Sequence, residues 1–218
     1  MTEAEWLVAA NPQALLEFVR EQATDRKLRL YAVACGHAVE HELIDEGLQL
    51  LEACGAYADG RLEWGELTAY REAAKRPNLY GQSHSRRSGR AGQAALRATI
   101  AIAWGKGAPP AQAVEEVIVL CLEARRHSNW KRASEEFSHF LRDIFPFRPV
   151  SFAPSWRAPT VTFLAQTMYD ARDFSAMPLL ADALQVSGCD NAEVLNHCRG
   201  LGPHCRGCWV VDAILGKG

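Results

Sequence analysis

The chain has no run of apolar residues that approaches the roughly 18 uninterrupted positions required by a membrane-spanning helix. Its first residues, Met1 to Glu5, are acidic and lack the basic and apolar regions of a secretory signal peptide. No segment shows convincingly the alternation of apolar and polar residues that is typical of a β-strand. We therefore expect an all-α cytoplasmic protein with no membrane partner, whose seven cysteines stay reduced.

The sequence also lacks the common signatures of catalysis. It contains no glycine-rich phosphate loop of standard form, no nucleophile elbow and no arrangement of serine, histidine and aspartate. The net charge of −2 favours no class of partner by itself. A non-enzymatic interaction or regulatory module, with another protein as its partner, is the leading expectation.

Helix signals recur along most of the chain, and they predict a single compact array of about nine to eleven short helices. Asn11 before Pro12 predicts the capped start of one helix. Asp190 with Glu193 predicts a capping box near the end of the chain. Gly200 is predicted to take the left-handed conformation that follows many helix ends.

Residues 77–92 interrupt this helical pattern. The stretch is polar, basic and rich in glycine, which predicts a mobile loop. We expect one domain over residues 1–218, with a possible division into N-terminal helices at 1–76 and C-terminal helices at 93–218.

Arginines gather in and beside this loop, between residues 76 and 90. Arg86, Arg87 and Arg90 alternate with serine and glycine, which suits contacts with phosphate groups without reading of the bases. A nucleic-acid-associated protein is therefore the first alternative function. A solvated loop explains the same residues without any ligand.

The strongest chemical signal is a cluster of potential metal ligands between residues 189 and 208. Thiolates and imidazoles close together are what a tetrahedral zinc site needs, and zinc here would pin the last two helices together. Buried thiols and surface histidines explain the same residues without a metal. Neighbouring residues on a helix point in different directions, so we do not expect all members of the cluster to bind. The cluster consists of Cys189, His197, Cys198, His204, Cys205 and Cys208.

A second zinc pattern, H-x-x-E-H, is formed by His37, Glu40 and His41. Residues four apart on a helix share a face, so both imidazoles could bind zinc with Glu40 beside them as a base. A zinc-dependent hydrolase is therefore the second alternative function. The pattern is short and no convincing third ligand follows it, and an amphipathic helix with a polar face explains it more simply.

Two parts of the chain resemble a family of uncharacterised bacterial proteins. The first part contains MTEAEWL and DRKLRLYAVAC, and the second contains LRDIF, FRPV, GCDN, HCR and GCWVVD. The resemblance implies no activity, because none is established for that family. Its members carry an apolar residue in place of Cys205 and a basic or bulky run in place of H-x-x-E-H. The resemblance thus leaves a smaller set of candidate zinc ligands, namely Cys189, His197, Cys198, His204 and Cys208.

Overall fold

The computed structural model describes residues 1–75, 89–105, 107–125 and 130–217. Over these residues the chain forms twelve α-helices and no strand, so the predicted all-α fold is confirmed, with one helix beyond the expected range. None of the described helices combines the length and the apolar character that a membrane crossing requires. Most of the predicted loop at 77–92 lies outside the described residues.

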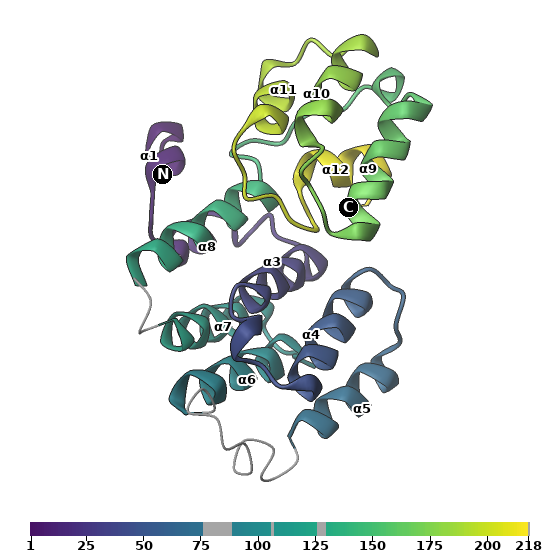
Figure 1. Cartoon of the computed structure of the whole chain (residues 1–218). Coiled ribbons are helices and arrows are strands. Elements are labelled where there is room, and N and C mark those ends of the chain that lie inside the picture. The colour runs from purple at the N-terminus through teal and green to yellow at the C-terminus, as the bar shows by residue number, and fades with distance from the viewer. Residues whose placement is uncertain (76–88, 106, 126–129, 218) are drawn as a thin grey trace. The chain divides into compact units, whose positions relative to one another are not determined.

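Contacts between residues divide the chain into two units, Met1–Ser138 and His139–Gly218. In the first unit, α3 packs on α4, α6 and α7, α6 packs on α4 and α7, α2 packs on α7, and α5 packs on α4 and α6 (Figure 1). The elements of this unit are α1 (Glu3–Val8), α2 (Pro12–Val19), α3 (Asp25–His37), the 3-10 helix η1 (Glu40–Glu42), α4 (Asp45–Ala58), α5 (Trp64–Ala74), α6 (Arg90–Ile102) and α7 (Pro110–Ala124).

A charged side chain lies in the interior of the first unit. Arg29 is only 2% exposed, and its guanidinium group lies 4.0 Å from the ring centroid of Trp104 and 4.9 Å from that of Tyr57. It donates hydrogen bonds to the backbone carbonyls of Ile102 and Trp104. Hydrogen bonds and aromatic faces thus compensate the cost of burying this charge.

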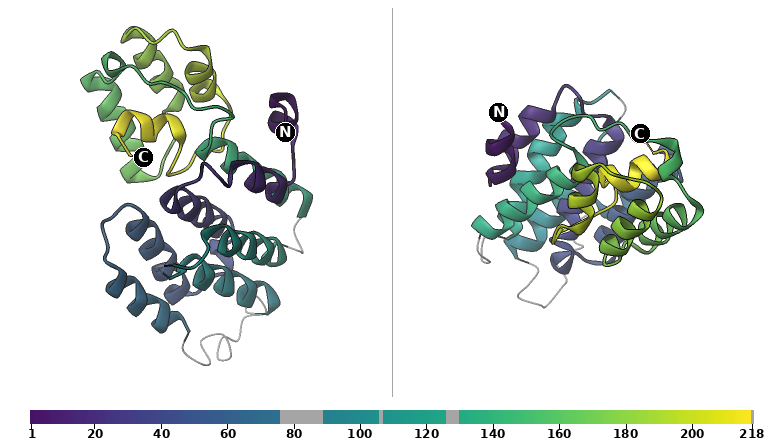
Figure 2. Two further views of the ribbon diagram at one scale, coloured as in Figure 1. Left: turned by 180° about the vertical axis from the view of Figure 1, so that it is seen from behind. Right: turned by 90° about the horizontal axis from the view of Figure 1, so that it is seen from above.

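The second unit consists of the end of α8 and four helices that follow it. Helix α9 packs on α10 and α12, and α11 packs on α10 and α12; the views in Figure 2 show the same grouping. Between α8 and α9 the chain forms one turn of 3-10 helix, η3. The elements are α8 (Trp130–Ile144), η3 (Pro154–Trp156), α9 (Pro159–Ala171), α10 (Met177–Val186), α11 (Ala192–Arg199) and α12 (Trp209–Leu215).

Local signals place most helix starts, but two details of the cap predictions are wrong. Asn11 caps α2 as predicted, with its side chain accepting hydrogen bonds from the next backbone N–H groups. Helix α11 is capped in the same way by Asn191, and not by the predicted pair of Asp190 and Glu193. Gly200 follows the end of α11 with a φ of −63° and an extended backbone. The predicted left-handed conformation at this residue is therefore wrong.

The boundary between the two units lies inside α8, which differs from the predicted division at the basic loop. Helices α5 and α6, on either side of that loop, belong to one unit and pack against each other. Glycine and polar residues indicate where a helix ends, but they carry no information about which helices share a core. A division within a continuous helix therefore has no signal of this kind.

Candidate metal centre

Four side chains of the second unit converge on one point. They are Asp143, His197, His204 and Cys208, and the ligand atoms that they offer all lie within 4.8 Å of one another. Three of the four, the two imidazoles and Cys208, belong to the set predicted from the sequence. Asp143 does not, and it is the one member that lies outside the C-terminal stretch.

Each ligand is held by a different part of the chain. Asp143 lies on the last turn of α8, His197 on the last turn of α11, and Cys208 is the residue before α12. His204 lies in the turn between α11 and α12, after Gly202, which has a φ of +70°. A Cβ atom at Gly202 would lie 3.0 Å from the backbone nitrogen of His204, so glycine is required for this close turn.

The spacing of the donor atoms suits a single ion. Nδ1 of His204 lies 2.6 Å from Oδ1 of Asp143, and Nε2 of His197 lies 3.1 Å from the same oxygen and 3.2 Å from Sγ of Cys208. Tetrahedral zinc with bonds of about 2.0–2.3 Å holds its ligand atoms about 3.3–3.8 Å apart. The donors thus need to move by about 1 Å or less to surround a zinc ion.

Asp143 is the centre of the polar network. It is 3% exposed, and besides the two imidazoles it accepts hydrogen bonds from the backbone N–H of Cys205 at 2.8 Å and from the Cys205 thiol at 3.4 Å. Burial by itself raises the pKa of this carboxyl group, but the hydrogen bonds from His197 and His204 oppose burial, and the pKa lies below its usual range. Asp143 is therefore a carboxylate, the form that binds a cation.

The pKa of the Cys208 thiol is shifted in the opposite direction from that of Asp143. Burial raises the pKa of its thiol well above the ordinary value, and the negative charge of Asp143 raises it further. A bound cation would reverse this effect, because a coordinating thiol loses its proton. A cation at this point would be balanced by the carboxylate of Asp143 and by the thiolate that Cys208 would become.

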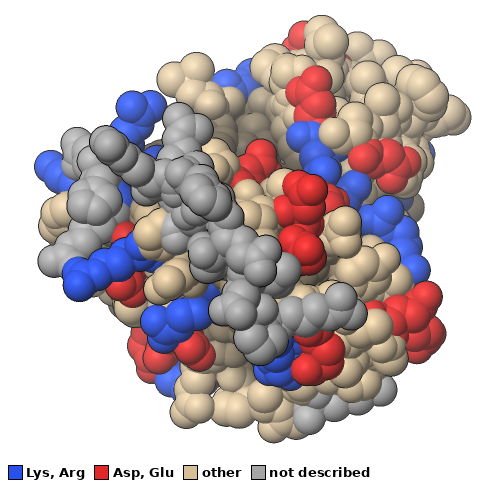
Figure 3. Space-filling view, turned by 60° about the horizontal axis from the view of Figure 1, so that its bottom comes forward, with Lys and Arg blue, Asp and Glu red and all other residues tan. Residues whose placement is uncertain are grey.

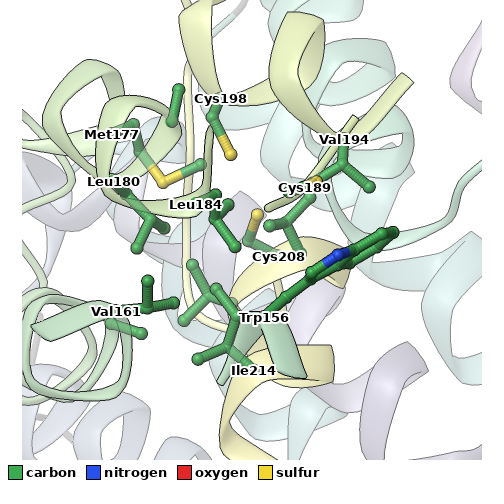
Figure 4. Packing of buried hydrophobic residues seen from close by; sticks show 14 of the residues in the cluster. Trp156, Val161, Met177, Leu180, Leu184, Cys189, Val194, Cys198, Cys208 and Ile214 are labelled. Atoms are coloured by element: carbon green, nitrogen blue, oxygen red, sulfur yellow. The ribbon is translucent and has the colours of Figure 1, made fainter. Parts of the chain in front are cut away.

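The other two predicted ligands, Cys189 and Cys198, are not members of this group of four. Their exposed fractions are 2% and 0%. Figure 4 shows both thiols among the apolar side chains in the core of the second unit, Cys189 beside Val194 and Cys198 near Leu184. Burial raises the pKa of Cys198 to about 12 and also raises the pKa of Cys189. Both thiols are packed as small apolar groups, as free cysteines often are in a core.

The sequence carries a weak signal for Asp143 that a search for cysteine and histidine overlooks. Asp143 follows the buried Phe140 by three positions and precedes the buried Ile144, so it lies near the apolar face of α8. A carboxylate in such a position requires a partner. Its ligand partners are more than fifty residues away in the sequence, so no spacing pattern could connect them to it.

The H-x-x-E-H pattern does not lie on one helical face. Helix α3 ends at His37, and Glu40 and His41 belong to the 3-10 helix η1. His37 contacts Glu40 at 2.8 Å, whereas His41 is 62% exposed and lies 3.6 Å from Glu42. The geometric premise of the hydrolase prediction is therefore wrong, because the helix ends before the pattern is complete.

The arginines of the basic loop are the predicted contacts for nucleic acid. Arg86 and Arg87 lie outside the described residues, and Arg90 is an exposed residue at the start of α6. On the face drawn in Figure 3, the Lys and Arg side chains are interspersed with Asp and Glu side chains. Binding of nucleic acid through this loop stays a prediction.

Comparisons with known proteins add no family. No protein-family model matches the chain, and neither a curated protein nor a solved structure matches it. The resemblance noted in the sequence stays a prediction. The chemistry of the four converging side chains is therefore the basis for a function.

Proposed function

We propose that this chain is a non-enzymatic helical interaction module whose C-terminal unit is held together by a zinc ion bound to Asp143, His197, His204 and Cys208. The observation that carries the proposal is the convergence of these four ligand atoms within 4.8 Å. One carboxylate, two imidazoles and one thiol offer oxygen, nitrogen and sulfur donors. Zinc accepts all three in tetrahedral sites, whereas calcium and magnesium prefer oxygen alone.

A structural role is favoured over a catalytic one because the site is closed. Asp143 and Cys208 are 3% and 0% exposed, and four protein ligands fill a tetrahedral zinc ion. Catalytic zinc sites keep one position open for water or substrate. A zinc ion here would join the end of α8, the end of α11 and the start of α12.

The thiol and the imidazole at this site also do not form a catalytic pair. In a cysteine nucleophile with its histidine base, one ring nitrogen faces the thiol and the other faces an orienting group. Here Nε2 of His197 faces both Cys208 and Asp143, while Nδ1 accepts a hydrogen bond from the indole of Trp209. The buried thiol is moreover closed to a substrate.

Another protein is the proposed partner. The second unit carries large apolar side chains at its surface, Phe163 on α9 and Leu179 and Val186 on α10, with exposed fractions of 70%, 61% and 90%. Such side chains supply apolar contact area at protein interfaces. A partner that binds the native chain but not a Phe163→Glu, Leu179→Glu chain would support this part of the proposal.

The zinc content of the full-length chain tests the proposal. Protein purified under reducing conditions without chelators, or loaded with zinc and freed of excess, is expected to hold about one zinc ion per chain. His204→Ala and Cys208→Ala are each expected to lose it, because a four-ligand site loses a quarter of its donors. His41→Ala, a histidine outside the group, serves as the matched control and keeps the zinc. A native chain that retains no zinc after loading contradicts the proposal.

A further inference from the structure

Trp209 contacts His197 on Nδ1, the ring nitrogen that does not face Asp143 and Cys208. Its indole Nε1 lies 3.1 Å from Nδ1 of His197, and the two ring centroids are 4.9 Å apart. The indole is 6% exposed and belongs to the apolar core of the second unit. An indole N–H can only donate a hydrogen bond, so Nδ1 of His197 is the acceptor.

This contact fixes the tautomer of His197. A neutral imidazole whose Nδ1 accepts a hydrogen bond carries its proton on Nε2. That Nε2–H then faces the carboxylate oxygen of Asp143 at 3.1 Å and the sulfur of Cys208 at 3.2 Å. The hydrogen bonds of His197 are thus complete without an ion.

A metal ion on Nε2 requires the other tautomer. The ion takes the lone pair of Nε2, so a neutral ring holds its proton on Nδ1. Nδ1–H would then face the indole N–H of Trp209 across 3.1 Å, and two donors cannot satisfy each other. Metal-binding histidines nearly always donate this second N–H to an oxygen acceptor, which Trp209 does not provide.

The second imidazole of the site has the same deficiency. Nδ1 of His204 faces Asp143, and its Nε2 is buried without a hydrogen-bond partner among the described residues. The side chain of His204 is 8% exposed. With a metal on Nδ1, Nε2 would carry a proton that no acceptor in the described parts of the chain receives. With the metal on Nε2 of His197 and on Nδ1 of His204, neither imidazole has, among the described residues, the supporting acceptor that strengthens metal binding.

We infer that Trp209 competes with the metal for His197, so that zinc binds in exchange with a metal-free, hydrogen-bonded state and its arrival displaces the indole N–H. This inference rests on the proposed zinc site and adds its regulation. Trp209 directly follows the ligand Cys208 and begins α12. Occupancy of the site by zinc is thereby coupled to the position of a side chain in the core of the second unit.

The test compares zinc affinities of the native chain and Trp209→Phe, measured by competition with a chromophoric chelator. Phenylalanine keeps an aromatic ring and removes the competing N–H. Zinc is expected to bind Trp209→Phe about 5- to 150-fold more tightly, the range that corresponds to the removal of one unsatisfied buried donor. Trp156→Phe, a tryptophan of the same core that makes its ring contact with Phe152, is the control with unchanged affinity.

Nitrogen NMR of the native chain gives a second measurement if Trp209→Phe does not fold. In the metal-free protein His197 is expected to carry its proton on Nε2, and addition of zinc is expected to move that proton to Nδ1 and to shift the indole N–H resonance of Trp209. Zinc binding that is equal or weaker in Trp209→Phe, or an indole resonance that zinc leaves unmoved, overturns the inference while the zinc site stands. Zinc binding to neither protein removes the inference and the proposed function together.

Discussion

Removal of zinc is expected to lower the melting temperature of the full-length chain, because the ion binds only the folded state. The proposed ion would join three helix ends of the second unit through four ligands, an arrangement that exists only in the folded chain. A ligand that binds the folded state alone stabilises it by about 2.7 kcal/mol when its free concentration is 100 times Kd. For a chain of 218 residues, each kcal/mol shifts Tm by about 2–4 °C. A strong chelator is therefore expected to lower Tm by about 5–11 °C.

Differential scanning calorimetry with and without a chelator measures this shift. His204→Ala has no complete site, so its Tm is expected not to respond to the chelator, whereas His41→Ala is expected to respond like the native chain. Renewed addition of zinc is expected to restore the native Tm. A native Tm that moves by less than about 1 °C, or an equal shift in His204→Ala, would show that zinc does not join these helix ends.

Two further predictions concern groups outside the site. Burial raises the pKa of Cys54 and of Cys121 to about 12, so above pH 9 the unfolded chain loses these protons while the folded chain keeps them. Stability is therefore expected to fall as pH rises from about 9 toward 12, by about 1.4 kcal/mol per pH unit for each thiol, and Cys121→Ala should reduce this slope in urea unfolding curves. A slope that Cys121→Ala leaves unchanged would contradict the assignment. Arg29→Ala is expected to lower the free energy of unfolding by about 3 kcal/mol, because two hydrogen bonds from a charged group and its aromatic contacts are lost. The zinc content of the second unit is expected to stay unchanged in this variant. A loss of zinc would contradict the description of the two units.

The helical fold is predictable because its signals are local. Asn11 before Pro12 begins a helix in the structure as it does in the sequence pattern, since a cap needs only its neighbours along the chain. Local signals mislead at two helix ends. Gly200 has an extended and not a left-handed backbone, and α3 ends at His37, before the H-x-x-E-H pattern is complete. The boundary within α8 has no local signal at all.

The candidate site is only partly predictable for a related reason. His197, His204 and Cys208 lie close in sequence, so their residue types alone indicate a metal site. Cys189 and Cys198 share that stretch, but tertiary packing leaves their thiols outside the group of four converging ligand atoms. Asp143 reaches the site through packing between helices distant in sequence, which composition and spacing do not encode.

X-ray absorption at the zinc edge of the loaded, full-length chain identifies the ligands of the ion without any substitution. The proposed site requires one sulfur ligand at about 2.3 Å and three nitrogen or oxygen ligands at about 2.0–2.2 Å, two of them with the multiple scattering of imidazole. Two or more sulfur ligands would mean that Cys189, Cys198 or Cys205 binds the ion, and an all-oxygen shell would mean adventitious binding; either result would contradict the site formed by Asp143, His197, His204 and Cys208.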